Sequence, residues 1–557
     1  MNVIYKIRSF FFRYWMVLLP ALLFGLLLLR NPYSDRTLIP NLEPYPDSIH
    51  YISPALGLLR GQGLNINREG RKLLPGVPPL YSLVLVPGFI LNQDVRTFYI
   101  VNIVLAFVAF FFFYLIVAKI TSNKFFLFLL MCLYATNYTL YWFPELAMAE
   151  NLILPLILVA LYLLVSPVTR RKAFLAGAIA VSFYATKFAS LPLSVAVPFL
   201  YFVKILTTKE KGKRDILLAF FVSLGIWGGV YVLYEYVVRA NNIIWSLLDL
   251  FWSLFSPKRV IGAVSGVPQK GGFFSLQYVG MNLSAYGHWL IGDPMYILWK
   301  NISILPKYLA LVGWLGIIGS LFTKRRSLAL TLFALLIFNM FFMMTFYAAD
   351  GRYFTIAIPI LLINIALCFS FIKEKLHGKA RLLAGAVVAS LCLIYAVSSL
   401  GRLKFDVMLN LKHAETPWYY ISIRTFNGYL KSHAGEFTKE PVVISALPPY
   451  LVDFYSTEKF IIVPLSANQE FRTHKQEAWG NLDYDNLLQV YANFFTEGHP
   501  VILTGYGLGN EAYLHEAFDS FLARFTFQKV QDGCYSLCNI YRMTSTAPSK
   551  PLAAKKK

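Results

Sequence analysis

The chain has 557 residues, of which 57% are hydrophobic and only 14% are charged, and its mean hydropathy is +0.55. A soluble globular protein carries about 25% charged residues, so this composition excludes an ordinary soluble protein and indicates a polytopic membrane protein. The net charge of +22 does not indicate nucleic-acid binding. The Lys and Arg residues gather in short loops between apolar runs, which is the distribution that orients membrane helices.

The first apolar run, at 14–29, follows three basic residues and predicts a membrane helix. A cleaved signal peptide would end at a small-residue cleavage site, but this run is followed by Arg30, Asn31 and Pro32. We therefore expect an uncleaved helix with a cytoplasmic N-terminus, and a first outer loop at 30–97.

Within that loop, the segment 78–91 (PPLYSLVLVPGFIL) is apolar but is interrupted by Pro87. It is shorter than the ~20 residues that span a bilayer, so we interpret it as an interfacial or partly embedded helix. With this segment set aside, about eleven transmembrane helices are predicted within 1–400, and every loop that they place in the cytoplasm is basic. After the first, the expected helices cover 98–118, 125–143, 148–166, 173–189, 190–206, 216–236, 302–322, 328–347, 353–372 and 382–400.

The C-terminal segment at 401–545 has a soluble-like composition and is expected outside the membrane, on the extracytoplasmic side. Short β-rich runs alternate there with helix-like stretches, which predicts a small α/β domain with a parallel sheet. The β-rich runs are 442–446, 460–465 and 501–505, and the remaining 546–557 is expected to be a disordered basic tail. GYGLG at 505–509 lacks the full nucleotide-binding fingerprint, so a strand-to-helix turn is the simpler interpretation.

Two of the five cysteines, Cys534 and Cys538, lie in this C-terminal segment. An extracytoplasmic position permits a disulfide between them, and two free thiols remain the alternative. Three residues separate them, whereas a catalytic redox pair has two. No cysteine spacing suggests a metal site, and we predict neither a metal nor a cofactor.

Four acidic residues stand where the predicted topology reaches the outer face. Asp47 lies in the first outer loop with Glu43 four residues before it, and Glu145 and Glu150 flank the break between two helices. Ionisable groups at a membrane boundary are candidates for function. Solvated loop carboxylates, or exposed acids in a tight turn, are the alternative interpretation.

Two cations are expected on the same side. Lys187 lies between two apolar runs, and Arg352 opens the helix that follows Asp350. Each has a plain alternative: Lys187 can snorkel to the interface, and Arg352 can anchor a lipid headgroup while paired with Asp350. Together with a carboxylate, however, two cations suggest a division of labour. The cations hold a phosphate leaving group, and the carboxylate removes a proton from the incoming nucleophile.

These residues together resemble the GT-C superfamily of integral-membrane glycosyltransferases, and within it the ArnT-like, protein-mannosyltransferase branch known as glycosyltransferase family 39. Members have an acidic residue in the first outer loop that is followed by a Tyr, a small-apolar pair and a Gly. They also have a PPLY segment, a Glu that opens a helix, a Thr-Lys pair and an Arg-Tyr element before a Pro. The matching residues in this sequence are Asp47, Tyr51, Ala55, Leu56 and Gly61, then Pro78 to Tyr81, Glu150, Thr186, Lys187, Arg352, Tyr353 and Pro359.

The resemblance implies a membrane glycosyltransferase domain at 1–400 that inverts the anomeric carbon. Asp47 would be the general base, Lys187 and Arg352 would bind the donor phosphate, and Glu43, Tyr51, Glu150 and Tyr353 would support them. The implied donor is a polyprenyl-phosphate sugar in the cell membrane, and the acceptor is a glycan, a lipid or a protein. One departure is Ser48, where the family often has a second acidic residue.

Two other functions remain open. A surface-glycan polymerase or ligase would take a lipid-pyrophosphate donor and show a long, Arg-rich outer loop, and the loop at 239–300 is long. A multi-pass transporter would show internal repeats and mid-membrane ionisable residues, whereas the polar candidates here gather at one face and no repeat is visible.

Overall fold

The computed structural model divides the chain into two compact units, each described here by itself. The membrane unit comprises Met1–Asn67, Lys72–Val260 and Pro268–Ala414, and the C-terminal unit comprises Glu415–Lys557 with the short segments Arg68–Arg71 and Ile261–Val267. The structure describes residues 2–29, 32–33, 47–68, 71–73, 77–210, 212–238, 243–255, 260–261, 268–270, 274–297, 300–347, 349–412, 418–445, 458, 460–464, 484–504, 523–532 and 539–546.

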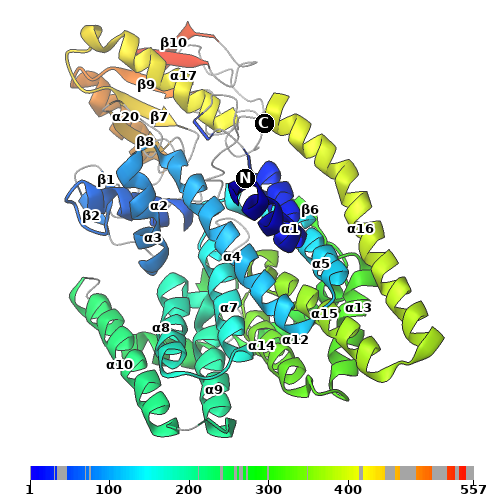
Figure 1. The fold of residues 1–557 in the computed structure, drawn as a ribbon. Helices are drawn as coiled ribbons and strands as arrows, with labels where there is room; N and C mark the ends of the chain where they lie inside the picture. The colour runs from blue at the N-terminus through cyan, green and yellow to red at the C-terminus, as the bar shows by residue number, and fades with distance from the viewer. Residues whose placement is uncertain are drawn as a thin grey trace. The chain divides into compact units, whose positions relative to one another are not determined.

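The described part of the membrane unit is built almost wholly of helices (Figure 1). They are α1 (Asn2–Leu28), α2 (Asp47–Leu59), α3 (Leu80–Leu91), α4 (Phe98–Ile120), α5 (Lys124–Thr136), α6 (Tyr138–Trp142), α7 (Glu150–Val165), α8 (Arg170–Thr186), α9 (Leu191–Thr207), α10 (Lys213–Val237), α11 (Ile243–Ser253), α12 (Val279–Leu290), α13 (Lys307–Ser320), α14 (Arg326–Met344), α15 (Ala357–Lys375) and α16 (Gly378–Lys412).

Short 3-10 turns and two-stranded hairpins connect these helices. The turns are η1 (Val95–Thr97), η2 (Phe143–Glu145), η3 (Phe188–Ser190), η4 (Leu276–Tyr278) and η5 (Gly351–Phe354). The hairpins pair β1 (Ile66–Arg68) with β2 (Arg71–Leu73), β3 (Val260–Ile261) with β4 (Pro268–Lys270), and β5 (Met295–Ile297) with β6 (Lys300–Ile302).

Six helical segments among the described residues are long and apolar enough to cross a membrane, so the chain is a polytopic membrane protein. They are Val95–Ile120, Phe188–Thr207, Lys213–Val237, Arg326–Met344, Gly351–Lys375 and Gly378–Ser399. The helix expected at 125–143 is bent by 53° between α5 and α6. The bend falls at Asn137, whose side chain caps α6 through the Leu140 N–H and donates to the Ile304 carbonyl at 2.8 Å.

The count of eleven spans is not confirmed. The spans expected at 148–166 and 302–322 are the shorter apolar helices Glu150–Val165 and Lys307–Ser320, and the one expected at 173–189 corresponds to α8, which has 17 residues. The first expected span, at 14–29, overlaps the 27-residue helix α1, whose apolar part with described side chains is Trp15–Leu28. The segment that we interpreted as non-spanning forms α3, which has only 12 residues. At the other end of the unit, α16 continues to Lys412, beyond the expected helix end at 400.

Helix α15 is the central element of the membrane unit, because 94% of its apolar window is buried, against 17% for α16. It packs directly on α13, where Gly313 and Gly316 allow the backbones to approach. A Cβ atom at Gly316 would lie only 1.9 Å from the Asn364 carbonyl oxygen. This close packing fixes η5, which immediately precedes α15 and carries Arg352.

The described part of the C-terminal unit is a five-stranded sheet with two helices. The strand order is β10 (Thr526–Gln531), β11 (Ile540–Ser545), β9 (Val501–Thr504), β7 (Val442–Ser445) and β8 (Ile461–Pro464), and the helices are α17 (Trp418–Ser432) and α20 (Tyr484–Thr496). Strand β7 is parallel to β8 and β9, whereas β11 is antiparallel to β9 and β10.

The three β-rich runs of the sequence are the three parallel strands of this sheet, and their alternate side chains form its core. Val442, Ile444 and Val501 are buried there with Leu488 and Tyr491 of α20. The sequence analysis did not predict β10 and β11. The segment 505–509, the cysteines Cys534 and Cys538, and the tail from 547 lie outside the described residues.

Candidate functional site

A buried ion pair joins the beginning of α7 to the end of α8. Glu150 is the first residue of α7, and Lys187 follows Thr186, the last residue of α8. The Lys187 Nζ lies 2.6 Å from Glu150 Oε1, and the two side chains are only 9% and 4% exposed. A carboxylate at a helix N-terminus and an ammonium at a helix C-terminus are both favoured by the helix dipole, so the backbone supports the pair from both sides.

A second ion pair is formed within the turn that leads into α15. Asp350 Oδ1 accepts a hydrogen bond from the Arg352 backbone N–H at 2.9 Å, and Asp350 Oδ2 accepts from Arg352 Nε at 2.7 Å. Arg352 Nη2 lies 2.6 Å from Asp350 Oδ2, and the Arg352 side chain is only 7% exposed. Because Asp350 contacts the guanidinium along its edge, it fixes the orientation of the planar group.

The two pairs meet at Tyr353. The Lys187 ammonium lies 4.6 Å from the centroid of the Tyr353 ring, and the Arg352 guanidinium carbon lies 5.7 Å from it. Glu150 also interacts electrostatically with Arg352 and Tyr353. We call Glu150, Lys187, Asp350, Arg352 and Tyr353 the charge cluster. Two cations and two carboxylates thus lie near Tyr353, at the beginning of α7, the end of α8 and the turn before α15.

A polar and aromatic chain connects the charge cluster to α2. The Tyr81 hydroxyl donates to Asn102 Oδ1 at 2.7 Å. Asn102 and Asn151, the neighbour of Glu150, both donate to the Leu146 carbonyl. The rings of Tyr81 and Tyr51 meet edge to face, with centroids 5.1 Å apart. Asn102 Nδ2 in turn donates to the Pro144 and Leu146 carbonyls. Helices α2, α3, α4 and α7 are therefore held together at one end.

The position of Asp47 follows from its helix. Asp47 is the first residue of α2, four residues before Tyr51, and residues four apart lie on the same helix face. Its side chain and the whole of Glu43 lie outside the described residues. Helix α2 ends at a turn in which Gly61 has a φ of 71°, a conformation that favours glycine over other residues.

The structure thus brings together four of the residues selected from the sequence, namely Glu150, Lys187, Arg352 and Tyr353, and links Tyr51 to them. The burial of Lys187 and Glu150 argues against a snorkelling lysine and an exposed acid. Glu145, by contrast, ends η2 and is half-buried. Within the described ranges, no three His, Cys, Asp or Glu side chains come close enough to hold a metal ion.

The sequence analysis missed Asn102, which connects Tyr81 to the loop before α7. Its signal was a single amide in the otherwise apolar and aromatic stretch of α4 (FYIVNIVLAFVAFFFFYLIVAKI). A polar side chain inside such a run requires a partner, and Asn102 finds the Tyr81 hydroxyl and the Pro144 and Leu146 carbonyls. Asn151 was also missed, because it directly follows Glu150, whose charge is the more conspicuous signal.

The fold and the charge cluster define a class: polytopic membrane proteins with buried ionic groups gathered at the ends of their helices. Among solved structures, the chain is similar to ArnT from Cupriavidus metallidurans bound to undecaprenyl phosphate, with 14% identity and a TM-score of 0.59 over 96% of this chain and 99% of that one. The apo structure of ArnT gives 13% identity and a TM-score of 0.57, with 96% and 98% covered.

A weaker similarity, with a TM-score of 0.46 and 10% identity, links the chain to the archaeal oligosaccharyltransferase AglB from Archaeoglobus fulgidus in complex with an inhibitory peptide and a dolichol-phosphate, with 98% and 75% covered. No family model and no curated protein matches the sequence. The ArnT-like GT-C fold that the sequence motifs suggested is confirmed by the two ArnT structures as a likeness of fold.

Proposed function

We propose that this protein is a membrane glycosyltransferase that moves a sugar from a polyprenyl-phosphate donor to a glycan, lipid or protein acceptor. The observation that carries the proposal is the charge cluster. It gathers buried Lys187 and Arg352 around Tyr353 in a chain with the fold of ArnT, which has been crystallised with undecaprenyl phosphate.

Lys187 and Arg352 bind the donor phosphate in this proposal. When the bond from the sugar to the phosphate oxygen breaks, negative charge develops on the departing phosphate. Cations already fixed in a buried site stabilise that charge without reorganising. Glu150 and Asp350 hold the two cations in position, and their ion pairs with Lys187 and Arg352 support this role.

Asp47 is the proposed general base, with Glu43 in support. The carboxylate takes the proton of the acceptor hydroxyl, and the acceptor oxygen attacks the anomeric carbon on the face opposite the phosphate. The polyprenyl phosphate leaves with the electrons of the broken bond, so the configuration at the anomeric carbon is inverted. The beginning of α2 suits this role, because Tyr51 contacts Tyr81, and the hydrogen bonds of Asn102 and Asn151 lead from Tyr81 towards Glu150.

The test is transfer from radiolabelled polyprenyl-phosphate sugars in membranes that contain the wild type, Asp47→Asn or the control Asp215→Asn. Asp215 is exposed in the first turn of α10, so its variant applies the same chemical change away from the site. Loss of a general base lowers the rate by roughly 10²–10⁴-fold. We expect that loss for Asp47→Asn and none for Asp215→Asn, at equal protein levels.

Two outcomes would contradict the proposal in different ways. Unchanged transfer by Asp47→Asn would remove Asp47 as the base and leave the enzyme class intact. Wild-type transfer from pyrophosphate-linked donors alone would replace the monophosphate donor with that of a surface-glycan polymerase or ligase.

A further inference from the structure

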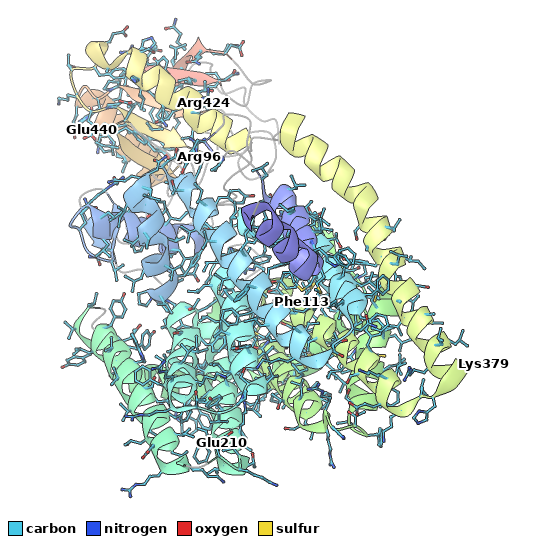
Figure 2. All side chains as sticks on the ribbon, viewed as in Figure 1. Arg96, Phe113, Glu210, Lys379, Arg424 and Glu440 are labelled. Atoms are coloured by element: carbon cyan, nitrogen blue, oxygen red, sulfur yellow. The ribbon has the colours of Figure 1, made fainter. Side chains whose placement is uncertain are left out.

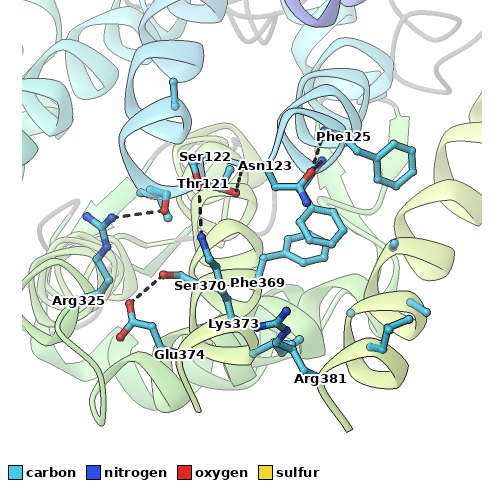
Figure 3. A pocket seen from close by; sticks show the side chains of 18 of the residues that line it. Thr121, Ser122, Asn123, Phe125, Arg325, Phe369, Ser370, Lys373, Glu374 and Arg381 are labelled. Carbon is cyan, nitrogen blue, oxygen red and sulfur yellow. Dashed lines mark hydrogen bonds between the residues drawn. The ribbon is translucent and has the colours of Figure 1, made fainter. Parts of the chain in front are cut away.

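A second polar site lies at the opposite end of α4 and α15 from the charge cluster. It is a pocket of about 790 Å³ between the ends of α4 and α15, the beginnings of α5 and α16, and Arg325 just before α14 (Figure 3). Asn102 and Lys119 mark the two ends of α4, and they are about 25 Å apart along the helix axis at 1.5 Å per residue. The pocket is thus separate from the proposed catalytic site. We call it the basic pocket.

Four cationic residues line the basic pocket. Arg325 Nη2 donates to the Lys119 and Ile120 carbonyls at the end of α4, at 3.0 and 3.4 Å. Lys373 Nζ is 3.5 Å from Ser122 Oγ, and Arg381, on the first turn of α16, has no ion-pair partner among the described residues. Lys119 also lines the pocket, and its ammonium donates to Ser166 Oγ at 2.8 Å.

The described lining of the basic pocket carries less negative than positive charge. Glu374 is the one acidic residue among the lining side chains, and it accepts from Ser370 Oγ at 3.4 Å and from the Lys324 backbone N–H at 3.5 Å. Figure 3 shows Lys373 directed at Ser122, with Arg381 on the neighbouring helix. The pocket therefore carries a net positive charge that attracts a phosphate.

The other wall of the basic pocket is apolar. Phe126 and Phe369 stack with centroids 3.8 Å apart, and the α16 side is formed by the small residues Gly385, Ala386 and Ala389. A Cβ atom at Gly385 would lie 4.0 Å from the Phe126 ring, so α16 passes the ring at this small residue. Helix α16 exposes large apolar side chains beside it, including Leu382 at 76%.

We propose that the basic pocket binds an anionic glycerophospholipid. Its phosphate lies between Lys373 and Arg381, and an acyl chain lies on the Phe126 ring and the apolar surface of α16. Basic pockets between membrane helices are the sites at which such headgroups bind. A free phosphate would use the cations but not the apolar wall, and a neutral lipid would use the wall but not the cations. This inference does not depend on the proposed function.

The test uses the 557-residue protein in detergent and adds one of three probes. The probes are dioleoyl phosphatidylglycerol, dioleoyl phosphatidylcholine and inorganic phosphate. Bound lipid is counted by native mass spectrometry, and thermal unfolding reports stabilisation. We expect phosphatidylglycerol to bind and stabilise the wild type, and the other two probes to have little effect.

Two pocket variants and one control make the test specific. Lys373→Ala with Arg381→Ala should weaken phosphatidylglycerol binding by about 30-fold, because each cation near an anionic lipid is worth roughly fivefold. Ala389→Phe should abolish binding while keeping every charge. Lys375→Ala with Lys379→Ala removes two exposed cations of the same region that do not line the pocket, and it should bind as the wild type does.

Each contrary result overturns the inference. Equal binding by the wild type and both pocket variants would show that lipid does not occupy the pocket. Equal weakening by the control pair would show nonspecific charge attraction. Equal stabilisation by inorganic phosphate would identify a free anion as the ligand, and equal binding of phosphatidylcholine would remove the role of charge.

Discussion

Lys187 and Glu150 show how much of this site depends on single residues. Each carries a charge that is almost completely buried, and each is tolerated because the other lies 2.6 Å away. A buried ion pair adds little net stability, whereas removal of one partner leaves a buried charge without compensation. The pair is therefore better explained by a functional need for a cation at this position than by stability.

The difference in stability between an intact buried ion pair and a single buried charge gives a prediction at the residue scale. Lys187→Met should lower the free energy of unfolding by roughly 3–5 kcal/mol, because Glu150 would be left buried without its cation. The double variant Lys187→Met with Glu150→Leu should recover most of that stability, since both charges are absent. Sugar transfer should stay low in both variants.

The measurements are thermal unfolding in one detergent and transfer in reconstituted vesicles. A single variant as stable as the wild type would contradict the pairing. A double variant that recovers transfer together with stability would show that Lys187 has a structural role alone.

At the scale of elements, the position of Arg352 depends on how α15 is held. Arg352 lies in η5, directly before α15, and α15 is buried along almost its whole length. The contact with α13 is so close that the backbones meet at Gly316. In a membrane, such small residues allow helices to pack without a hydrophobic driving force.

The corresponding prediction is that Gly316→Ala destabilises the protein. The added methyl group would lie 1.9 Å from the Asn364 carbonyl oxygen, so α13 and α15 must separate, at a cost of about 1–3 kcal/mol. Gly228→Ala in α10 is the matched control, since no atom lies within 4 Å of its Cβ position. Thermal unfolding of both variants checks this, and equal midpoints would contradict it.

At the scale of the whole molecule, the distribution of charge predicts which parts face the cytoplasm. The loop before α10 is rich in lysine, as are the other loops expected inside, and such loops resist translocation. The proposed orientation therefore has that loop in the cytoplasm and the five-stranded sheet outside.

Two matched cysteine variants test the orientation in a background without native cysteines. Glu210 and Glu440 are exposed glutamates (both labelled in Figure 2), one in the loop before α10 and the other just before β7. In intact cells, a membrane-impermeant maleimide should label Glu440→Cys, and should label Glu210→Cys only after permeabilisation. The reverse pattern would invert the topology, and labelling of both in intact cells would place both outside.

The sequence by itself determined that this is a polytopic membrane protein, where most of its helices run, and three parallel strands of its sheet. Apolar runs encode helices because backbone groups in lipid must be satisfied within the segment. The buried strands were visible because each is a short β-branched run. Strands β10 and β11 were not, because TFQKVQ and IYRMTS mix polar and apolar side chains and their pairing depends on the neighbouring strand.

Only the tertiary structure decided which candidate residues meet. Glu150 and Lys187 are 37 residues apart, and Arg352 is far from both in the chain, so no local pattern encodes their contact around Tyr353. The same holds for the hydrogen bond from Tyr81 to Asn102 and for the basic pocket, whose walls come from four helices and Arg325. The hydrophobic pattern of a segment shows which of its faces must be buried. The packing of segments that are distant in sequence determines which residues bury that face.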